Sequence, residues 1–147
     1  MCVLALWLGL DPGIPLVVGA NRDESYARRS APPMEIEPGI IAGKDLEKGG
    51  TWLGLNRHGL FVGVTNRKSP VPTPASPSRG MLALETLRCK TLACVEDMVQ
   101  RRVADHAFGG FNLVAVVGGE GLCLHHDGTL RRAPFGAGIH VISSDQD

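Results

Sequence analysis

Cys2 is the residue on which the chemistry of this chain depends, because it places a thiol one position from the start of the sequence. A free cysteine has a pKa of about 8.5 and an α-amino group one of about 7.7 to 8.0, so an N-terminal cysteine carries its own base. The amine would take the thiol proton, the thiolate would attack an acyl carbon, and water would later hydrolyse the thioester. This mechanism requires removal of Met1. The alternative is a cysteine buried as a small hydrophobe on the first strand.

Two short apolar runs separated by a turn must position this thiol. Residues 2–8 and 15–20 have the composition of strands, and Asp11-Pro12-Gly13 is typical of a turn. These runs predict a β-hairpin whose second strand returns antiparallel to the first, toward the start of the chain. Residues 21–24 then lie beside Cys2, so that an amide, a guanidinium and two carboxylates share its neighbourhood.

The rest of the chain predicts further strands, two helices and two long loops. The expected strands are residues 40–42, 51–55, 60–65, 111–117, 122–126, 129–133 and a last one that begins at 139. The expected helices are residues 81–87 and 91–106, where apolar residues recur at helical spacing. Residues 25–38 and the proline-rich residues 70–77 are predicted loops, the second exposed and a candidate lid.

Motifs in the first half of the chain resemble those of the NRDE family, the family of the transport and Golgi organisation proteins. They are Cys2 after the initiator methionine, ANRDE at 20–24, GGTWLG at 49–54 and GLFVGVTN at 59–66. The layout is also similar, more distantly, to N-terminal-nucleophile (Ntn) hydrolases of the choloylglycine hydrolase and penicillin V acylase type. The resemblance implies an α/β, Ntn-hydrolase-like αββα layered sandwich with antiparallel sheets, formed by one domain over residues 1–147.

The same resemblance implies a catalytic set. Cys2 would be the nucleophile and base carrier, Asp23 would orient its amine, and Asn66, at the end of its strand, would donate to the developing oxyanion. The alternative for Asn66 is a turn-forming residue before residues 67–70. Two positions depart from the hydrolase pattern: Ala20 stands where an arginine is expected, and Ser143-Ser144 where a second asparagine is expected.

Three further residues are candidates for substrate binding. Asn21 and Arg22 follow the hairpin directly, and Arg22 would hold a substrate carboxylate or the local network. Trp52 is either a wall of the pocket or a core residue, because a single aromatic residue on a strand usually packs. Arg28 and Arg29 lie in the predicted loop and are interpreted as solvated, with contact to a substrate as the alternative.

Two classes of function are compatible with these residues. The first is an N-terminal cysteine amidohydrolase acting on a small amide or acyl compound. The second is a non-catalytic haem or lipid carrier, because the family has been connected with haem mobilisation and lipid homeostasis. No cofactor or metal is assigned to the hydrolase. The neighbouring His125 and His126 face opposite sides of a strand and cannot readily bind one ion together.

Composition excludes several partners. The chain of 147 residues has 15 Lys and Arg against 15 Asp and Glu, which gives no electrostatic case for nucleic acid or an anionic membrane. No apolar run approaches the roughly 20 residues needed to span a bilayer. Four cysteines without a CxxC pair indicate a reducing, cytoplasmic compartment, with Cys89 and Cys94 as packing residues.

The end of the sequence differs from the family pattern, which continues with more strands and helices. We therefore interpret the chain as the N-terminal portion of such a pattern. One sheet face is then expected to lack its cover, and self-association is the expected consequence.

Overall fold

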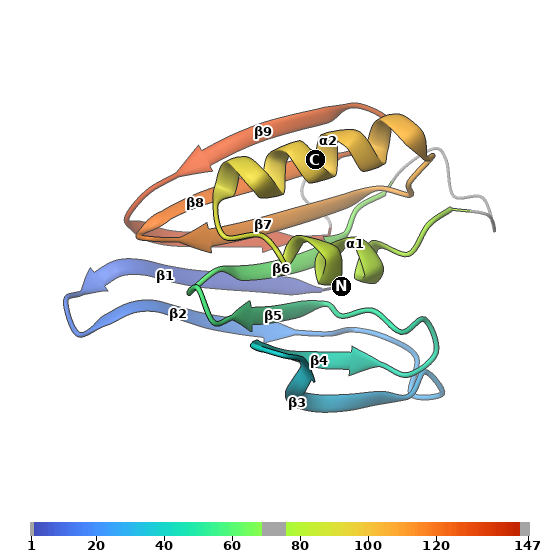
Figure 1. The fold of residues 1–147 in the computed structure, drawn as a ribbon, viewed down its shortest axis with the longest axis horizontal. Helices are drawn as coiled ribbons and strands as arrows, with labels where there is room; N and C mark the ends of the chain where they lie inside the picture. The colour runs from blue at the N-terminus through green and yellow to red at the C-terminus, as the bar shows by residue number, and fades with distance from the viewer. Residues whose placement is uncertain (1, 69–75, 145–147) are drawn as a thin grey trace.

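The computed structural model describes residues 2–68 and 76–144, which form two antiparallel sheets and two helices (Figure 1). The larger sheet has seven strands in the order β3-β4-β5-β6-β7-β8-β9, and the smaller has three in the order β10-β1-β2. The strands are β1 (Val3–Asp11), β2 (Ile14–Asn21), β3 (Ser30–Glu37), β4 (Ile40–Asp45), β5 (Leu53–Asn56), β6 (Phe61–Asn66), β7 (Phe111–Val117), β8 (Glu120–His126), β9 (Leu130–Phe135) and β10 (Gly138–Ser143). The helices are α1 (Arg79–Thr86) and α2 (Leu92–Asp105).

The predicted N-terminal hairpin is confirmed. β1 pairs antiparallel with β2, and Val3 lies opposite Asn21. β10 pairs with the other edge of β1, with Val3 opposite Ser143. The two ends of the described chain therefore meet, and the backbone N–H of Ser144 donates to the Cys2 carbonyl at 3.1 Å.

The elements stack in three layers, helices on the large sheet and the large sheet on the small one. Leu82 and Leu87 of the α1 region and Val95 and Val99 of α2 pack on one face of the large sheet. The opposite face packs on the small sheet through a core that includes Leu4, Leu6, Leu8, Phe61, Val114 and Val116. β7 lies between both cores, and its residues 111–116 are all buried. This is the mixed α/β layered arrangement that the sequence predicted.

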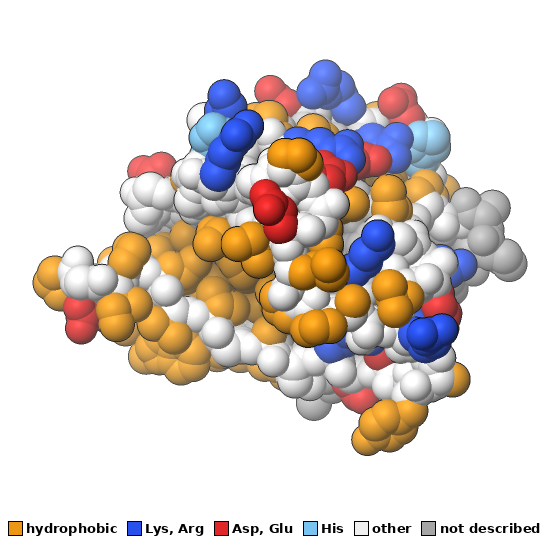
Figure 2. All heavy atoms as spheres, turned by 60° about the horizontal axis from the view of Figure 1, so that its bottom comes forward, with side chains coloured by type: hydrophobic (Ala, Val, Ile, Leu, Met, Phe, Trp, Pro, Cys, Tyr) orange, Lys and Arg blue, Asp and Glu red, His pale blue; other side chains and the backbone are white. Residues whose placement is uncertain are grey.

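The outer face of the small sheet carries exposed apolar side chains. Trp7, Val17, Ile139 and Val141 are all at least 37% exposed. Register places Val17 and Ile139 opposite Trp7 on the two sides of β1. Figure 2 shows hydrophobic side chains gathered over the β1–β2 hairpin, at the left of the view. Within the described ranges, both helices lie on the large sheet and leave this face uncovered.

The prediction of a loop over residues 25–38 is wrong in its second half. Residues 30–37 form β3, which pairs with β4 at the edge of the large sheet. The prolines at 32 and 33 lack the N–H that an interior strand needs, but an edge strand tolerates proline. A shift of register between Ala31 and Met34 accommodates them. Of the predicted proline-rich loop, residues 70–77, the stretch 70–75 lies outside the described residues.

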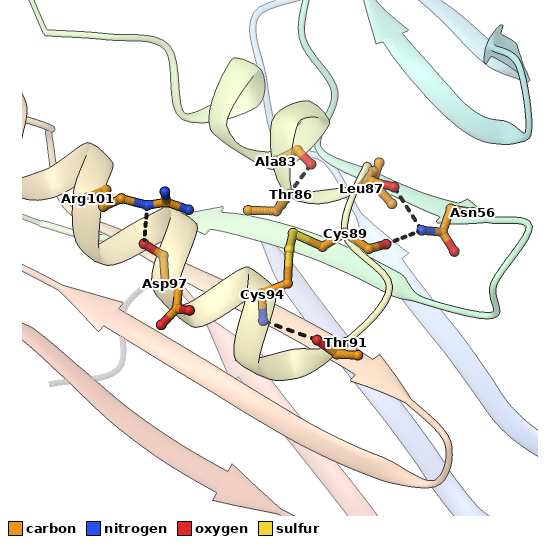
Figure 3. Close-up of a disulfide and its surroundings, with 9 residues drawn as sticks. All are labelled: Asn56, Ala83, Thr86, Leu87, Cys89, Thr91, Cys94, Asp97 and Arg101. Carbon is orange, nitrogen blue, oxygen red and sulfur yellow. Dashed lines mark hydrogen bonds between the residues drawn. A yellow bond between two sulfur atoms is a disulfide. The ribbon is translucent and has the colours of Figure 1, made fainter.

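The interpretation of Cys89 and Cys94 as packing residues is also corrected, because they form a disulfide (Figure 3). Cys89 follows α1 and is buried, and Cys94 lies in the first turn of α2. The side chain of Thr91 caps α2 by accepting from the Cys94 N–H at 3.2 Å. The tight connection between the two helices brings the Cα atoms to 5.7 Å, which a spacing of five residues alone does not reveal.

The prediction that His125 and His126 face opposite sides of their strand is confirmed. The ring of His126 stacks on Phe111 beneath the helices, with 5.2 Å between ring centroids. The His125 Nδ1 lies 2.7 Å from the Asn112 Oδ1, and Asn112 contacts the small sheet through the Ser143 carbonyl. Neither α1 nor α2 has the length and apolar character needed to cross a membrane.

Candidate functional site

A cavity of about 280 Å³ opens where the start of the chain meets the end of β6 and the beginning of α1. Its lining includes Cys2 and Asp23, which precede β1 and follow β2, and Asn66, which ends β6. Arg22 and Trp52 also line it, whereas Asn21 does not belong to the lining. The structure therefore brings five of the six sequence-predicted site residues to one cavity.

The sulfur of Cys2 contacts the backbone of Asp23. The Asp23 N–H donates to the Cys2 Sγ at 3.4 Å, and the Sγ lies 3.8 Å from the Asp23 carbonyl oxygen. Cys2 is half-buried.

The backbone nitrogen of Cys2 donates to the Ser144 Oγ at 3.3 Å. Sequence reasoning treated Ser144 only as a departure from the hydrolase pattern and missed this contact. The pairing of β10 with β1 produces this contact. Val3 lies opposite Ser143, so Cys2, just before Val3, lies beside Ser144, just after Ser143. The role predicted for the Asp23 carboxylate at the amine remains a prediction.

Asn21 bonds to the start of β1 instead of lining the cavity, and its predicted role in substrate binding remains a prediction. Its side-chain Oδ1 accepts from the Val3 N–H at 2.9 Å. The amide therefore joins the end of β2 to the start of β1, one residue after Cys2.

Arg22 and Trp52 form one wall of the cavity. The guanidinium carbon of Arg22 lies 4.8 Å from the centroid of the Trp52 ring, a cation–π contact. The Arg22 Nη2 also lies 3.5 Å from the Asp45 Oδ2. Arg22 is thus already engaged by an aromatic ring and a carboxylate of this chain.

Asp45 is the centre of an ion-pair network on the same wall. Its Oδ2 lies 2.7 Å from the Arg28 Nη2, and the Arg28 Nη1 lies 2.8 Å from the Glu24 Oε2. Burial opposes ionisation of Asp45, but the N–H groups of Lys48 and Glu47 and the Arg28 guanidinium hold the pKa of its carboxyl below the ordinary value. The interpretation of Arg28 as a solvated loop residue is therefore wrong, because the fold returns its loop to the end of β4.

Arg79 is a lining residue that sequence reasoning missed. It is the first residue of α1, and its Nη1 donates to the Gly110 carbonyl at 3.0 Å. Burial, together with the positive charge of Arg28, lowers the pKa of Arg79 from its ordinary value, and the negative charge of Glu24 opposes this shift only in part. One signal in the sequence could have placed Arg79 at the start of a helix. Ser78 is a typical N-cap residue, and its side chain accepts from the Met81 N–H at 3.3 Å.

The start of α1 is held close to the loop between β4 and β5. The Thr51 N–H donates to the Gly80 carbonyl at 3.0 Å. A Cβ atom at position 50 would lie 2.2 Å from the Gly80 carbonyl carbon, so this close approach requires Gly50. Gly50 therefore allows the backbone of this loop to pack directly on the backbone of Gly80. This contact fixes the position of the neighbouring Arg79 at the cavity.

These features define a layered α/β protein with a cysteine at its second position, placed in a polar cavity between strand ends and a helix start. The chain matches the Transport and Golgi organisation 2 family over residues 1–146 and belongs to that family. This confirms the NRDE resemblance seen in the sequence.

Three relatives show the extent of the similarity. The Transport and Golgi organization protein 2 homolog of Bos taurus is 31% identical over 105 residues, and those of Mus musculus and Homo sapiens are 32% identical over 105 residues. Each match covers 68% of this chain and 38% of the relative, so the matched region spans less than half of the relatives' length.

A solved structure is also similar to the chain. Penicillin V acylase from Agrobacterium tumefaciens aligns with a TM-score of 0.46 and 15% sequence identity, over 98% of this chain and 44% of that one.

Proposed function

We propose that this chain is an N-terminal cysteine amidohydrolase that acts on a small amide or acyl compound. The observation that carries the proposal is the Cys2 sulfur, half-buried in a polar cavity and 3.4 Å from a backbone N–H donor. A cysteine at position 2 becomes the N-terminal residue once Met1 is removed. Its α-amine is then close enough to its own thiol to accept the thiol proton.

The reaction would proceed in two steps. The α-amine of Cys2 takes the thiol proton, and the thiolate attacks the acyl carbon to form a tetrahedral oxyanion. Asn66 donates to that oxyanion, the C–N bond breaks, and the leaving amine receives the proton from the α-ammonium group. Water then attacks the thioester with the amine as base, which releases the acid and restores the thiol.

The remaining residues support the nucleophile in this scheme. Ser144 accepts from the Cys2 nitrogen and would hold the amine, and Asp23 would bias its orientation. Asn21 fixes the strand end, and Arg22 with Trp52 closes one wall. A cytoplasmic location, where methionine aminopeptidase acts on a small second residue, belongs to this proposal.

The test begins with the intact mass of the purified chain, which should lack Met1. A reactive ester such as p-nitrophenyl acetate should then add one acetyl group to the wild type and to Cys123→Ala, but not to Cys2→Ala. Cys123 is the matched control because it is buried at 4% exposure, and burial raises the pKa of its thiol to about 12. Iodoacetamide near neutral pH should likewise modify Cys2 before Cys123.

Two outcomes would refute the hydrolase. Retention of Met1 would remove the free amine from the mechanism. Equal acetylation of the wild type and Cys2→Ala would show that the thiol at position 2 has no special reactivity.

A haem or lipid carrier is the second candidate, and the exposed apolar side chains of the small sheet favour it (Figure 2). A carrier would bind haem stoichiometrically, with a shift of the Soret band, and would turn over no amide. Substitution of Val17 by a charged residue on this face should weaken carriage and leave acetylation of Cys2 unchanged, which separates the two functions.

A further inference from the structure

Among the three arginines that line the Cys2 cavity, Arg79 is distinguished by its partners. Arg22 and Arg28 each lie within 4.0 Å of a carboxylate, Asp45 in both cases. Within the described residues, Arg79 has no carboxylate at that distance, and the hydrogen bond from its side chain goes to the Gly110 carbonyl. A guanidinium has five N–H donors, so most of the hydrogen-bonding capacity of Arg79 is left for a ligand.

Arg79 is also placed rigidly. Its backbone begins α1, and the contact of Gly80 with Gly50 and Thr51 fixes that end of the helix. Its guanidinium lies against Gly109, where a Cβ atom would be 3.6 Å from the Nη1. A side chain already held in one position loses little entropy when a ligand binds.

The charge of the cavity also favours an anionic ligand. Its described lining has four cationic side chains, Arg22, Arg28, Lys48 and Arg79, and three acidic ones, Asp23, Glu24 and Asp45. Burial makes the extra positive charge costly, which the lowered pKa of Arg79 reflects. One bound anion would make the numbers of positive and negative charges in the cavity equal. It would also offer hydrogen-bond acceptors to the Arg79 guanidinium in place of the solvent that burial removes.

We propose that Arg79 binds a carboxylate group, so that the ligand of this cavity is a small acyl or amide compound with a carboxylate at one end. The planar guanidinium fork matches a carboxylate in bidentate geometry. The cavity volume of about 280 Å³ limits such a compound to a small one. The carboxylate contact stands on Arg79 alone, whereas the reacting carbonyl at the other end rests on the proposed hydrolase function.

Of the two roles predicted for Arg22, the holder of a substrate carboxylate or a member of the local network, the proposal keeps the second and gives the first to Arg79. Arg22 is occupied by Asp45 and Trp52, and a ligand would have to compete with both. Arg79 offers its donors without such competition.

The test uses the full chain with Cys2→Ala, so that no turnover occurs, and two probes that differ in one group. N-acetylglycine has the carboxylate, and N-acetylglycinamide replaces it with a neutral amide. Calorimetric titration should show that the acid binds at least about tenfold more tightly than the amide, since hydrogen bonds to charged groups are the stronger ones. Arg79→Gln should remove that preference, and Arg79→Lys should retain part of it.

Arg101→Gln is the matched control. Arg101 lies on α2, outside the lining, and its Nε donates to the Asp97 carbonyl, so the substitution should leave both affinities unchanged. Equal affinity of the two probes, absence of binding, or unchanged preference in Arg79→Gln would each overturn the proposal. If Arg79→Gln fails to fold, Arg79→Lys decides, because it keeps the charge and loses the fork. If the acid binds to Cys2→Ala but p-nitrophenyl acetate does not acetylate Cys2 in the wild type, the hydrolase is refuted and the Arg79 site stands.

Discussion

Asn56 joins the turn between β5 and β6 to the end of α1, and its replacement by alanine should destabilise the fold strongly. Its Nδ2 donates to the carbonyls of Leu87 at 2.8 Å and Cys89 at 2.6 Å (Figure 3). Its Oδ1 accepts from the N–H groups of His58 at 2.9 Å and Leu60 at 3.1 Å. One buried side chain thus makes four hydrogen bonds to backbone.

The magnitude follows from which partners lose contact with water. Leu60 and Leu87 are fully buried and Cys89 is 2% exposed, so Asn56→Ala leaves one N–H and two carbonyls without a partner and without solvent. A buried polar group left unsatisfied costs about 1 to 3 kcal/mol, so we expect a loss of about 3 to 5 kcal/mol. That is a large part of the 5 to 15 kcal/mol typical of a folded domain.

Urea denaturation followed by circular dichroism measures this loss. The midpoint should fall while the slope stays constant, because the surface exposed on unfolding hardly changes. Asn66→Ala is the control, since this asparagine ends the neighbouring strand β6 with an exposed side chain and should cost less than about 0.5 kcal/mol. A loss below about 1 kcal/mol for Asn56→Ala would show that this hydrogen-bonded junction does not hold α1 in place.

Two more predictions concern contacts outside the Cys2 cavity. Reduction of the disulfide between Cys89 and Cys94, five residues apart, should lower the free energy of unfolding by about 2 kcal/mol, measured by denaturation with and without dithiothreitol; identical curves would contradict it. Gly121→Ala should cost about 1 to 3 kcal/mol by thermal denaturation, because a Cβ there would lie 2.1 Å from the Phe135 ring. Gly136→Ala, whose added Cβ meets nothing within 4 Å, should be neutral, and equal effects of the two substitutions would refute the packing argument.

The sequence predicted most elements because their signals are local. The turn residues at 11–13 and their flanking apolar runs predicted the first hairpin, which the pairing of β1 with β2 confirms. Helical periodicity predicted α1 and α2 to within a few residues of their observed ends. Strand β3 was not predicted because its prolines disfavour a strand locally. They are tolerated because β3 lies at the edge of the sheet.

The candidate site divides in the same way. The sequence alone determined that a thiol at position 2 and a hairpin of that length would meet residues 21–24, since both follow from short-range geometry. Tertiary structure decided the rest: β10 brings Ser144 to Cys2 across 142 positions, and the close contact of Gly50 with Gly80 brings Arg79 to the cavity. It also decided that Arg28 pairs with Asp45 and that Cys89 bonds Cys94. Such contacts depend on how separate layers pack, and packing is a property of the whole chain that local spacing does not encode.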